Sequence, residues 1–197
     1  MKTALLIVDM QNDFLPGGSL AVAEGDEIIP TINKLQKQYD LIVATQDWHS
    51  ADHASFASQH PGKKVYEMAE LAGLPQVLWP DHCVQGSLGA QLSAALDQDR
   101  IATIFRKGMD PQIDSYSVFF DNGHKKAIGL EGYLKGLGIE EVHICGLAAD
   151  YCVFYSAMDA LSLGFKVGVI NKATKAISPQ GYEIARQELM NSGGKII

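Results

Sequence analysis

The sequence lacks the features that define several common classes of protein. Its 197 residues include only three cysteines, too few for a disulfide framework, which favours a reducing compartment. No apolar run approaches the roughly 20 residues that cross a bilayer. The apolar stretch 4–8 stops at Asp9 and is too short for the core of a signal peptide. We therefore expect a soluble cytoplasmic protein without a membrane segment.

An excess of positive charge is also absent, as are the common phosphate-binding motifs. The formal net charge is −7, which argues against a surface for nucleic acid or anionic lipid. The small-residue segment 146–149 has neither a GxGxxG pattern nor a Walker lysine, so nucleotide binding is disfavoured. The sequence leaves the oligomeric state open, with a homo-oligomer among the alternatives.

The distribution of apolar residues predicts the fold class. Hydrophobic residues make up 47% of the sequence, as in ordinary globular proteins, and the length suits a single domain over residues 1–197. Five nearly continuous apolar runs are typical of buried parallel strands: 4–8, 41–45, 101–105, 141–145 and 166–170. Helical spacing is found over 26–38, 88–96, 129–137, 150–163 and 179–190. This alternation predicts an α/β fold with helices on both faces of a mostly parallel sheet.

Residues 50–86 differ from the rest of the chain. They are rich in His, Pro, Gly and Trp and have no clear periodicity. Ligands of parallel α/β folds bind outside the carboxyl ends of the strands, where long connections form pocket walls. We expect this segment to form such a wall, and a surface insertion without function is the alternative.

Residues with chemical capability follow three of the apolar runs. Asp9 follows the first run, Asp47 the second and Lys107 the third. An acid that ends a buried run must be paired or functional, because burying a bare charge is costly. A lysine in this position would hold a nearby thiol and carboxylate in their charged forms.

Cys152 lies where the fourth apolar run gives way to a helical pattern, and it is the strongest candidate nucleophile. A helix opening at Asp150 or Ala149 would place its thiol in the first turn. There the helix dipole and free N–H groups favour a thiolate and a developing oxyanion. We interpret Cys145 as a packing residue inside a strand and leave Cys83 undecided, with packing favoured.

Histidines and a carboxylate between residues 47 and 82 have the pattern of a metal site. Asp47 and His49 point the same way in an extended segment and can share one cation, with His82 as the best third ligand. Three protein ligands with open positions describe a catalytic site, and they admit zinc, iron or manganese. His53 is either a fourth ligand or, as we favour, a residue behind the ligands; surface histidines without a metal are the alternative. The remaining histidines lack such ligand partners in the sequence and are interpreted as incidental: His60, His124 and His143.

Together these segments resemble the nicotinamidase/pyrazinamidase branch of the isochorismatase-like cysteine hydrolases. The resemblance rests on IVDMQNDFLPGGSLAV, QDWHSADHASF, LWPDHCVQGS, FRKGMDPQIDSYSVFFDN and GLAADYCV, in family order along most of the chain. It implies a three-layer α/β/α fold with a six-stranded sheet. It also implies the hydrolysis of nicotinamide, and of pyrazinamide, to the carboxylate and ammonia in NAD salvage.

The resemblance implies four groups of functional residues. They are a catalytic triad (Asp9, Lys107 and Cys152), a divalent metal site (Asp47, His49 and His82), an oxyanion hole (the N–H groups of Ala148 and Cys152) and an aromatic substrate pocket (Phe14, Trp79 and Tyr116). A cis peptide bond between Leu147 and Ala148 would turn the Ala148 N–H towards the oxyanion.

Three other functions are alternatives. A sibling hydrolase would act on another small amide, a ureido compound or an enol ether. A non-catalytic binding protein on this scaffold would have lost Asp9, Lys107 or Cys152, and this chain keeps all three. A redox-sensing thiol protein would need a second cysteine near Cys152.

Overall fold

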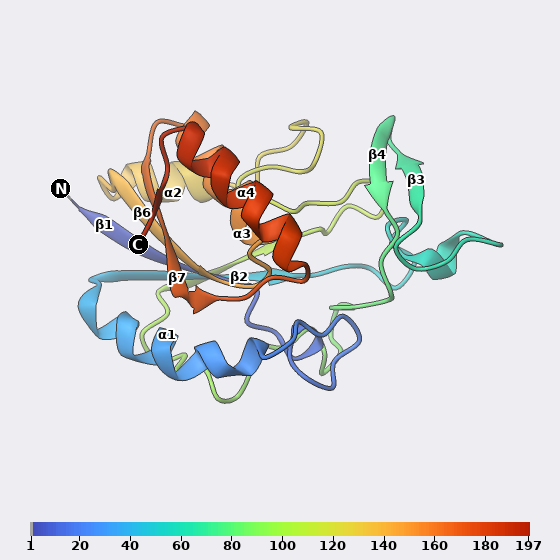
Figure 1. Cartoon of the computed structure of the whole chain (residues 1–197), viewed down its shortest axis with the longest axis horizontal. Coiled ribbons are helices and arrows are strands. Elements are labelled where there is room, and N and C mark those ends of the chain that lie inside the picture. The colour runs from blue at the N-terminus through green and yellow to red at the C-terminus, as the bar shows by residue number, and fades with distance from the viewer. Residues whose placement is uncertain (1) are drawn as a thin grey trace.

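The computed structural model describes residues 2–197, and its central feature is a six-stranded sheet (Figure 1). The strands lie in the order β5-β2-β1-β6-β7-β8. Their bounds are Thr3–Val8 (β1), Leu41–Asp47 (β2), Thr103–Lys107 (β5), Glu141–Gly146 (β6), Lys166–Thr174 (β7) and Lys195–Ile196 (β8). Every pairing between neighbours is parallel. The predicted α/β class and the six-stranded sheet are confirmed.

Helices cover both faces of the sheet (Figure 1). α1 (Ile29–Leu35) lies on one face, and α2 (Leu130–Gly136), α3 (Cys152–Ser162) and α4 (Pro179–Asn191) lie on the other. Single 3-10 turns, Gly25–Ile28 and Gln36–Gln38, extend α1 at both ends and complete the helix predicted over 26–38. The side chain of Ser178 caps α4 by accepting from the Gly181 N–H at 3.1 Å.

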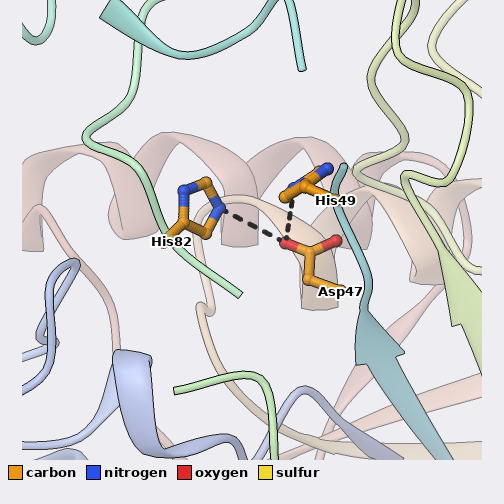
Figure 2. A group of neighbouring side chains, drawn as sticks. All are labelled: Asp47, His49 and His82. Carbon is orange, nitrogen blue, oxygen red and sulfur yellow. Dashed lines mark ion pairs between the residues drawn. The ribbon is translucent and has the colours of Figure 1, made fainter. Parts of the chain in front are cut away.

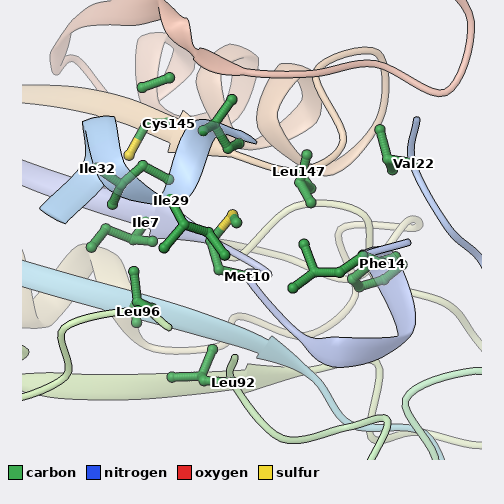
Figure 3. Packing of buried hydrophobic residues seen from close by; sticks show 14 of the residues in the cluster. Ile7, Met10, Phe14, Val22, Ile29, Ile32, Leu92, Leu96, Cys145 and Leu147 are labelled. Carbon is green, nitrogen blue, oxygen red and sulfur yellow. The ribbon is translucent and has the colours of Figure 1, made fainter. Parts of the chain in front are cut away.

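The apolar run of β1 is continuous because both of its faces are buried. Leu5 and Ile7 pack in the cluster on the α1 face, together with Ile32 (Figure 3). Leu6 and Val8 point the other way, into the cluster under α2 and α3. Side chains alternate along a strand, so a strand between two helical layers needs apolar residues at every position.

The segment 88–96 is not the helix that its spacing predicts. It is an irregular connection, although its Leu92 side chain is buried (Figure 3). The Asn12 N–H donates to the Gln91 carbonyl at 3.0 Å, and the Ser93 N–H donates to the Met10 carbonyl at 2.8 Å. In these bonds to the residues after β1, segment 88–96 uses backbone N–H and carbonyl groups that a helix would pair internally. Pairing with a distant part of the chain therefore outweighs the helical spacing of its apolar residues.

Two predicted element ends also need correction. The third strand runs from Thr103 to Lys107, two residues later than predicted at each end, so Lys107 is its last residue. α3 begins at Cys152 rather than at Ala149 or Asp150. The Asp150 carboxylate instead accepts the N–H groups of residues 177 and 178 at 3.0 and 2.8 Å, which ties it to the connection before α4.

Part of the aperiodic segment 50–86 is a hairpin that the sequence reasoning missed. β3 (Met68–Leu71) and β4 (Leu74–Val77) pair antiparallel and project on the side opposite the N terminus (Figure 1). Ala72 and Gly73 join them with φ values of 52° and 81°, and positive φ at both positions is typical of a type I′ two-residue turn. Among residues 2–197, no helix combines the length and apolarity that crossing a membrane requires.

Candidate active site

The residues predicted at the ends of the apolar runs meet at one edge of the sheet. β5, β2, β1 and β6 are neighbours, so their carboxyl ends bring Lys107, Asp47 and Asp9 alongside the start of α3. Asp47 and Lys107 are partners in the register of β2 and β5. Asp9 follows β1 with a φ of 47°, and Cys152 is the first residue of α3.

The Lys107 ammonium group lies at the centre of this cluster. Its Nζ donates to Asp47 Oδ1 at 2.6 Å, to the Ser115 carbonyl at 3.1 Å and to Cys152 Sγ at 3.3 Å. It also lies 2.9 Å from Asp9 Oδ2. The lysine side chain is fully buried, and a cation is retained in such a place only when anions and hydrogen-bond acceptors surround it.

The charges of these groups set their protonation states. Burial opposes the charge on Lys107, but Asp47 and Asp9 raise the pKa of its ammonium group well above the usual range. Burial likewise opposes ionisation of Asp47, but Lys107 and His49 hold the pKa of its carboxyl well below the usual range. For Asp9 burial prevails over Lys107 and raises the pKa of the carboxyl. Asp9 is therefore the carboxylate that is better suited to take up and return a proton.

The thiol of Cys152 is protonated at neutral pH. Burial raises its pKa well above the usual value of a thiol, whereas the Lys107 ammonium acts in the opposite direction. Lys107 acts in the predicted direction by favouring the thiolate, but burial has the larger effect on the pKa. A base has to remove the proton before Sγ can attack, and a carboxylate oxygen of Asp9 lies within 4.8 Å of Sγ.

Asp47, His49 and His82 form a second cluster that shares Asp47 with the first (Figure 2). Asp47 Oδ2 lies 3.5 Å from His49 Nε2 and 3.6 Å from His82 Nε2. Ligand atoms held about 2.1 Å from one tetrahedral ion lie roughly 3.4 Å apart. The three side chains are buried, both distances to Asp47 are close to this value, and all three ligand atoms lie within 4.8 Å of one another.

The hydrogen bonds of the two imidazoles also suit metal binding. His49 Nδ1 lies 2.9 Å from the Gly108 carbonyl oxygen, and His82 Nδ1 lies 2.8 Å from the Pro80 carbonyl oxygen. A carbonyl only accepts, so each Nδ1 carries a proton, and in the neutral ring each Nε2 then offers a lone pair on the side of Asp47. His49 Nε2 is buried without a hydrogen-bond partner among residues 2–197, a cost that a bound cation would remove. These residues therefore fit a divalent cation.

His53 has the opposite tautomer. Its Nδ1 accepts the Ser55 N–H at 3.2 Å, so the neutral ring carries its proton on Nε2 and offers no lone pair there. Burial and His49 lower the pKa of His53 to about 4, so the ring is neutral at neutral pH. Its ring centre lies 4.3 Å from that of His49. This geometry favours the interpretation that His53 packs against the ligand His49 and does not bind the cation itself.

A narrow pocket adjoins both clusters. It is lined by residues of both, among them Asp47, His82 and Cys152. The Tyr116 hydroxyl in its wall accepts from Gln76 Nε2 at 2.9 Å and from Trp79 Nε1 at 3.3 Å, which connects the wall to β4. The lining includes these residues singled out from the sequence: Phe14, Trp79, Tyr116, Ala148 and Cys152.

The turn from β6 to α3 presents backbone N–H groups to this pocket. The peptide bond between Leu147 and Ala148 is cis, as the resemblance implies. The hydrogen bonds formed among residues 2–197 leave the N–H groups of Ala148 and Cys152 without an acceptor. Gly146 begins the turn with a φ of 109°, and a Cβ there would lie 2.1 Å from the Val8 carbonyl oxygen, so only glycine fits. The two N–H groups can donate to an oxygen bound beside the thiol.

Sequence reasoning missed three residues that position these groups. Thr45 exchanges hydrogen bonds with Asp9. The Gln11 side chain bonds the Asp47 backbone twice, donating to its carbonyl and accepting its N–H, each at 2.8 Å. The buried Asp114 carboxylate lies 4.0 Å from His49 Nε2. Gln11 and Asp114 stand inside the segments quoted above, whereas Thr45 looks like an ordinary strand residue.

The residues interpreted as incidental lie outside both clusters. The three histidines have other partners: the Ala54 carbonyl for His60, Asp159 for His124 and Tyr39 for His143. Cys83 and Cys145 are buried and unpaired in the hydrophobic cluster on the α1 face, whereas Cys152 belongs to the cluster on the opposite face. The partner cysteine that a redox sensor would need is not provided by Cys145.

Comparison with known families and proteins gives a consistent result. The isochorismatase domain model matches residues 3–197. The chain is 47% identical to the nicotinamidase of Escherichia coli, over 98% of this chain and 93% of that protein. It is 50% identical to the nicotinamidase of Acinetobacter baylyi, over 96% of this chain and 89% of that protein.

Solved structures resemble the whole chain. A nicotinamidase/pyrazinamidase of Acinetobacter baumanii superimposes with a TM-score of 0.97 at 47% identity, covering 100% of this chain and 95% of that one. The yeast nicotinamidase bound to the inhibitor nicotinaldehyde gives 0.94 at 34% identity, with 99% of both chains covered. The pyrazinamidase of Pyrococcus horikoshii in complex with zinc gives 0.82 at 39% identity, covering 100% of this chain and 99% of that one.

Proposed function

The chain belongs to the isochorismatase domain family, and we propose that it is a nicotinamidase, which hydrolyses nicotinamide to nicotinate and ammonia in NAD salvage. Pyrazinamide, which differs by one ring nitrogen, is a second proposed substrate. We further propose that residues 1–197 form one hydrolase domain, because strands of a single sheet come from residues 3 to 196.

One observation carries the proposal. A single buried lysine donates to the candidate nucleophile Cys152 and contacts the candidate base Asp9. The same lysine bonds Asp47, which faces the Nε2 atoms of two imidazoles. A thiol, a base and a cation site therefore share one aromatic-walled pocket, which is the equipment for hydrolysing a small ring carboxamide.

In the first half of the proposed mechanism, Asp9 removes the proton from Cys152 and the thiolate adds to the carboxamide carbon. The Lys107 ammonium stabilises the negative charge as it passes from the carboxylate to sulfur. The N–H groups of Ala148 and Cys152 donate to the tetrahedral oxyanion. Asp9 then gives its proton to the departing ammonia, and a thioester between Cys152 and the nicotinoyl group remains.

Water completes the reaction. Asp9 takes a proton from the water as its oxygen adds to the thioester carbon, and the N–H groups again receive the oxyanion. The carbon–sulfur bond then breaks, and Asp9 returns the proton to sulfur. The product acid loses its own proton and leaves as nicotinate, so the free thiol and the Asp9 carboxylate are restored.

Asp47, His49 and His82 would hold a divalent cation, for which zinc, iron and manganese are all suitable. Bound there, such an ion supplies Lewis-acid binding for the ring nitrogen and lowers the pKa of a bound water. His53 would support His49 from behind and leave the remaining coordination positions open.

The test is ammonia release by purified, metal-analysed protein from nicotinamide, pyrazinamide and benzamide. We expect turnover of the first two and much slower turnover of benzamide, which has no ring nitrogen. The Cys152→Ala variant serves as the background. Absence of ammonia from nicotinamide, in protein that contains its metal and whose Cys152 reacts with iodoacetamide, would refute the proposed function.

A further inference from the structure

The two carboxylate oxygens of Asp9 have different surroundings, and Thr45 in β2 creates the difference. The Asp9 N–H donates to Thr45 Oγ1 at 3.1 Å. A hydroxyl oxygen that accepts a backbone N–H must direct its own hydrogen elsewhere, and this hydrogen goes to Asp9 Oδ1. Both residues are 0% exposed, so bulk water does not compete for these bonds.

Asp9 Oδ2 is the oxygen that stays open. An ammonium group has three protons, and Lys107 gives its own to Asp47, Ser115 and Cys152. Its 2.9 Å approach to Asp9 Oδ2 is therefore an ion-pair contact. Asp9 Oδ2 receives no hydrogen bond within residues 2–197, although it is buried.

From this arrangement we propose that Thr45 is a positioning residue for the reaction: its hydroxyl holds Oδ1 of Asp9 and thereby reserves Oδ2 for proton exchange with Cys152. The substrate in this inference, though not the proton exchange, rests on the proposed function. Without the hydroxyl, the carboxylate would turn about its Cβ–Cγ bond, and the backbone of Asp9 would lose the bond that fixes it where β1 ends. Misplacing a reacting group by about 1 Å can cost about 10²-fold in rate.

The test compares Thr45→Val, which removes the hydroxyl at nearly constant shape, with Thr45→Ser, which keeps it. Thr3→Val is the matched control, because the Thr3 hydroxyl also donates to a carboxylate, that of Glu141, at 3.4 Å, but does so where β1 begins, away from the site. We expect Thr45→Val to lower kcat by about 10- to 100-fold with little change in KM. Thr45→Ser should restore kcat, and Thr3→Val should keep it.

The inference is overturned if Thr45→Val keeps the wild-type kcat, if serine fails to restore a loss, or if Thr3→Val loses as much. Thr45→Ala removes the hydroxyl without placing a methyl group against the carboxylate, so it decides the question where the valine variant does not fold. Metal content and unfolding temperature are measured for every variant, to separate loss of positioning from loss of structure.

The rate of Cys152 alkylation by iodoacetamide tests the same step without the substrate. We expect it to fall in Thr45→Val and to recover in Thr45→Ser, with Cys152→Ala as the background. If this pattern holds while nicotinamide is not hydrolysed, the proposed function fails and the role of Thr45 stands. If nicotinamide is hydrolysed and Thr45→Val changes neither the alkylation rate of Cys152 nor kcat, the role of Thr45 fails and the function stands.

Discussion

The two halves of the active site are built in different ways. Asp9, Asp47 and Lys107 lie at the ends of adjacent parallel strands, and Cys152 opens the helix after a fourth. The other half comes from the long connections 50–86 and 108–129, which supply the pocket residues His82, Trp79, Tyr116 and Asp114. The strand half therefore holds the charges that move protons, and the loop half shapes the pocket. Substitutions in the strand half should lower kcat, and substitutions in the loop half should change metal content and KM.

The largest effect should come from removing the nucleophile in the strand half. Cys152→Ala abolishes the covalent route and should lower kcat by about 10⁴-fold or more, since a remaining oxyanion hole supplies only residual catalysis. Ammonia release measures it, and Cys145→Ala is the control because that sulfur packs on the other face of the sheet. A Cys152→Ala enzyme with near-native turnover would end the thioester mechanism.

Lys107→Met should reduce both activity and stability. It leaves the buried carboxylates of Asp9 and Asp47 uncompensated, and breaking such a buried pair costs about 3–5 kcal/mol, measurable by urea unfolding. Lys107 lowers the pKa of Cys152, so its removal raises that pKa, and the pH profile of iodoacetamide alkylation should move to higher pH. The exposed Lys135, paired with Glu131, is the control, where methionine should cost under about 0.5 kcal/mol. An unmoved profile would contradict the contact with the thiol.

His82→Ala tests the one ligand that the loop half contributes. Loss of a residue that merely orients a ligand costs about 10- to 100-fold in metal affinity, so loss of a ligand should cost at least as much. Elemental analysis of the purified variant should find little metal, and added zinc should raise its unfolding temperature less than that of the wild type. His60→Ala, in the same connection, should keep its metal. Full occupancy in His82→Ala would mean that other residues hold the ion.

The strand half could be predicted from the sequence because its signal is local. A buried parallel strand needs apolar residues at nearly every position, so Asp9, Asp47 and Lys107 are conspicuous where each run stops. The loop half has no such periodicity, and His82 was found through the resemblance as much as through chemistry. The hairpin of β3 and β4 was missed for the same reason. The helix predicted over 88–96 failed because its backbone pairs with residues 10–12, which no local pattern reveals.

The protonation states of the site residues depend on how deeply each residue is buried, and burial cannot be read from the sequence. A cysteine at a helix start beside a lysine predicts a thiolate, but in this fold burial dominates and the thiol keeps its proton. Thr45 was overlooked for a similar reason. A threonine in a strand is ordinary, and only the path of the chain after β1 brings Asp9 against its hydroxyl. What the sequence lacked was the position of each group relative to solvent and to neighbouring strands.

The smallest effect should come from the hydroxyl of Tyr116 in the loop half. Tyr116→Phe removes the acceptor of Gln76 and Trp79, but Gln76 keeps two others, the Asp114 carboxylate at 3.1 Å and the Val77 carbonyl at 2.8 Å. Only the Trp79 N–H loses its partner, so we expect a loss of about 1 kcal/mol, seen as an increase of about fivefold in KM with kcat unchanged. Tyr39→Phe, whose hydroxyl contacts His143 at the far end of the sheet, should leave both constants unchanged. A lower kcat in Tyr116→Phe would mean that the loop half also positions the reacting groups, and the division between the two halves would fail.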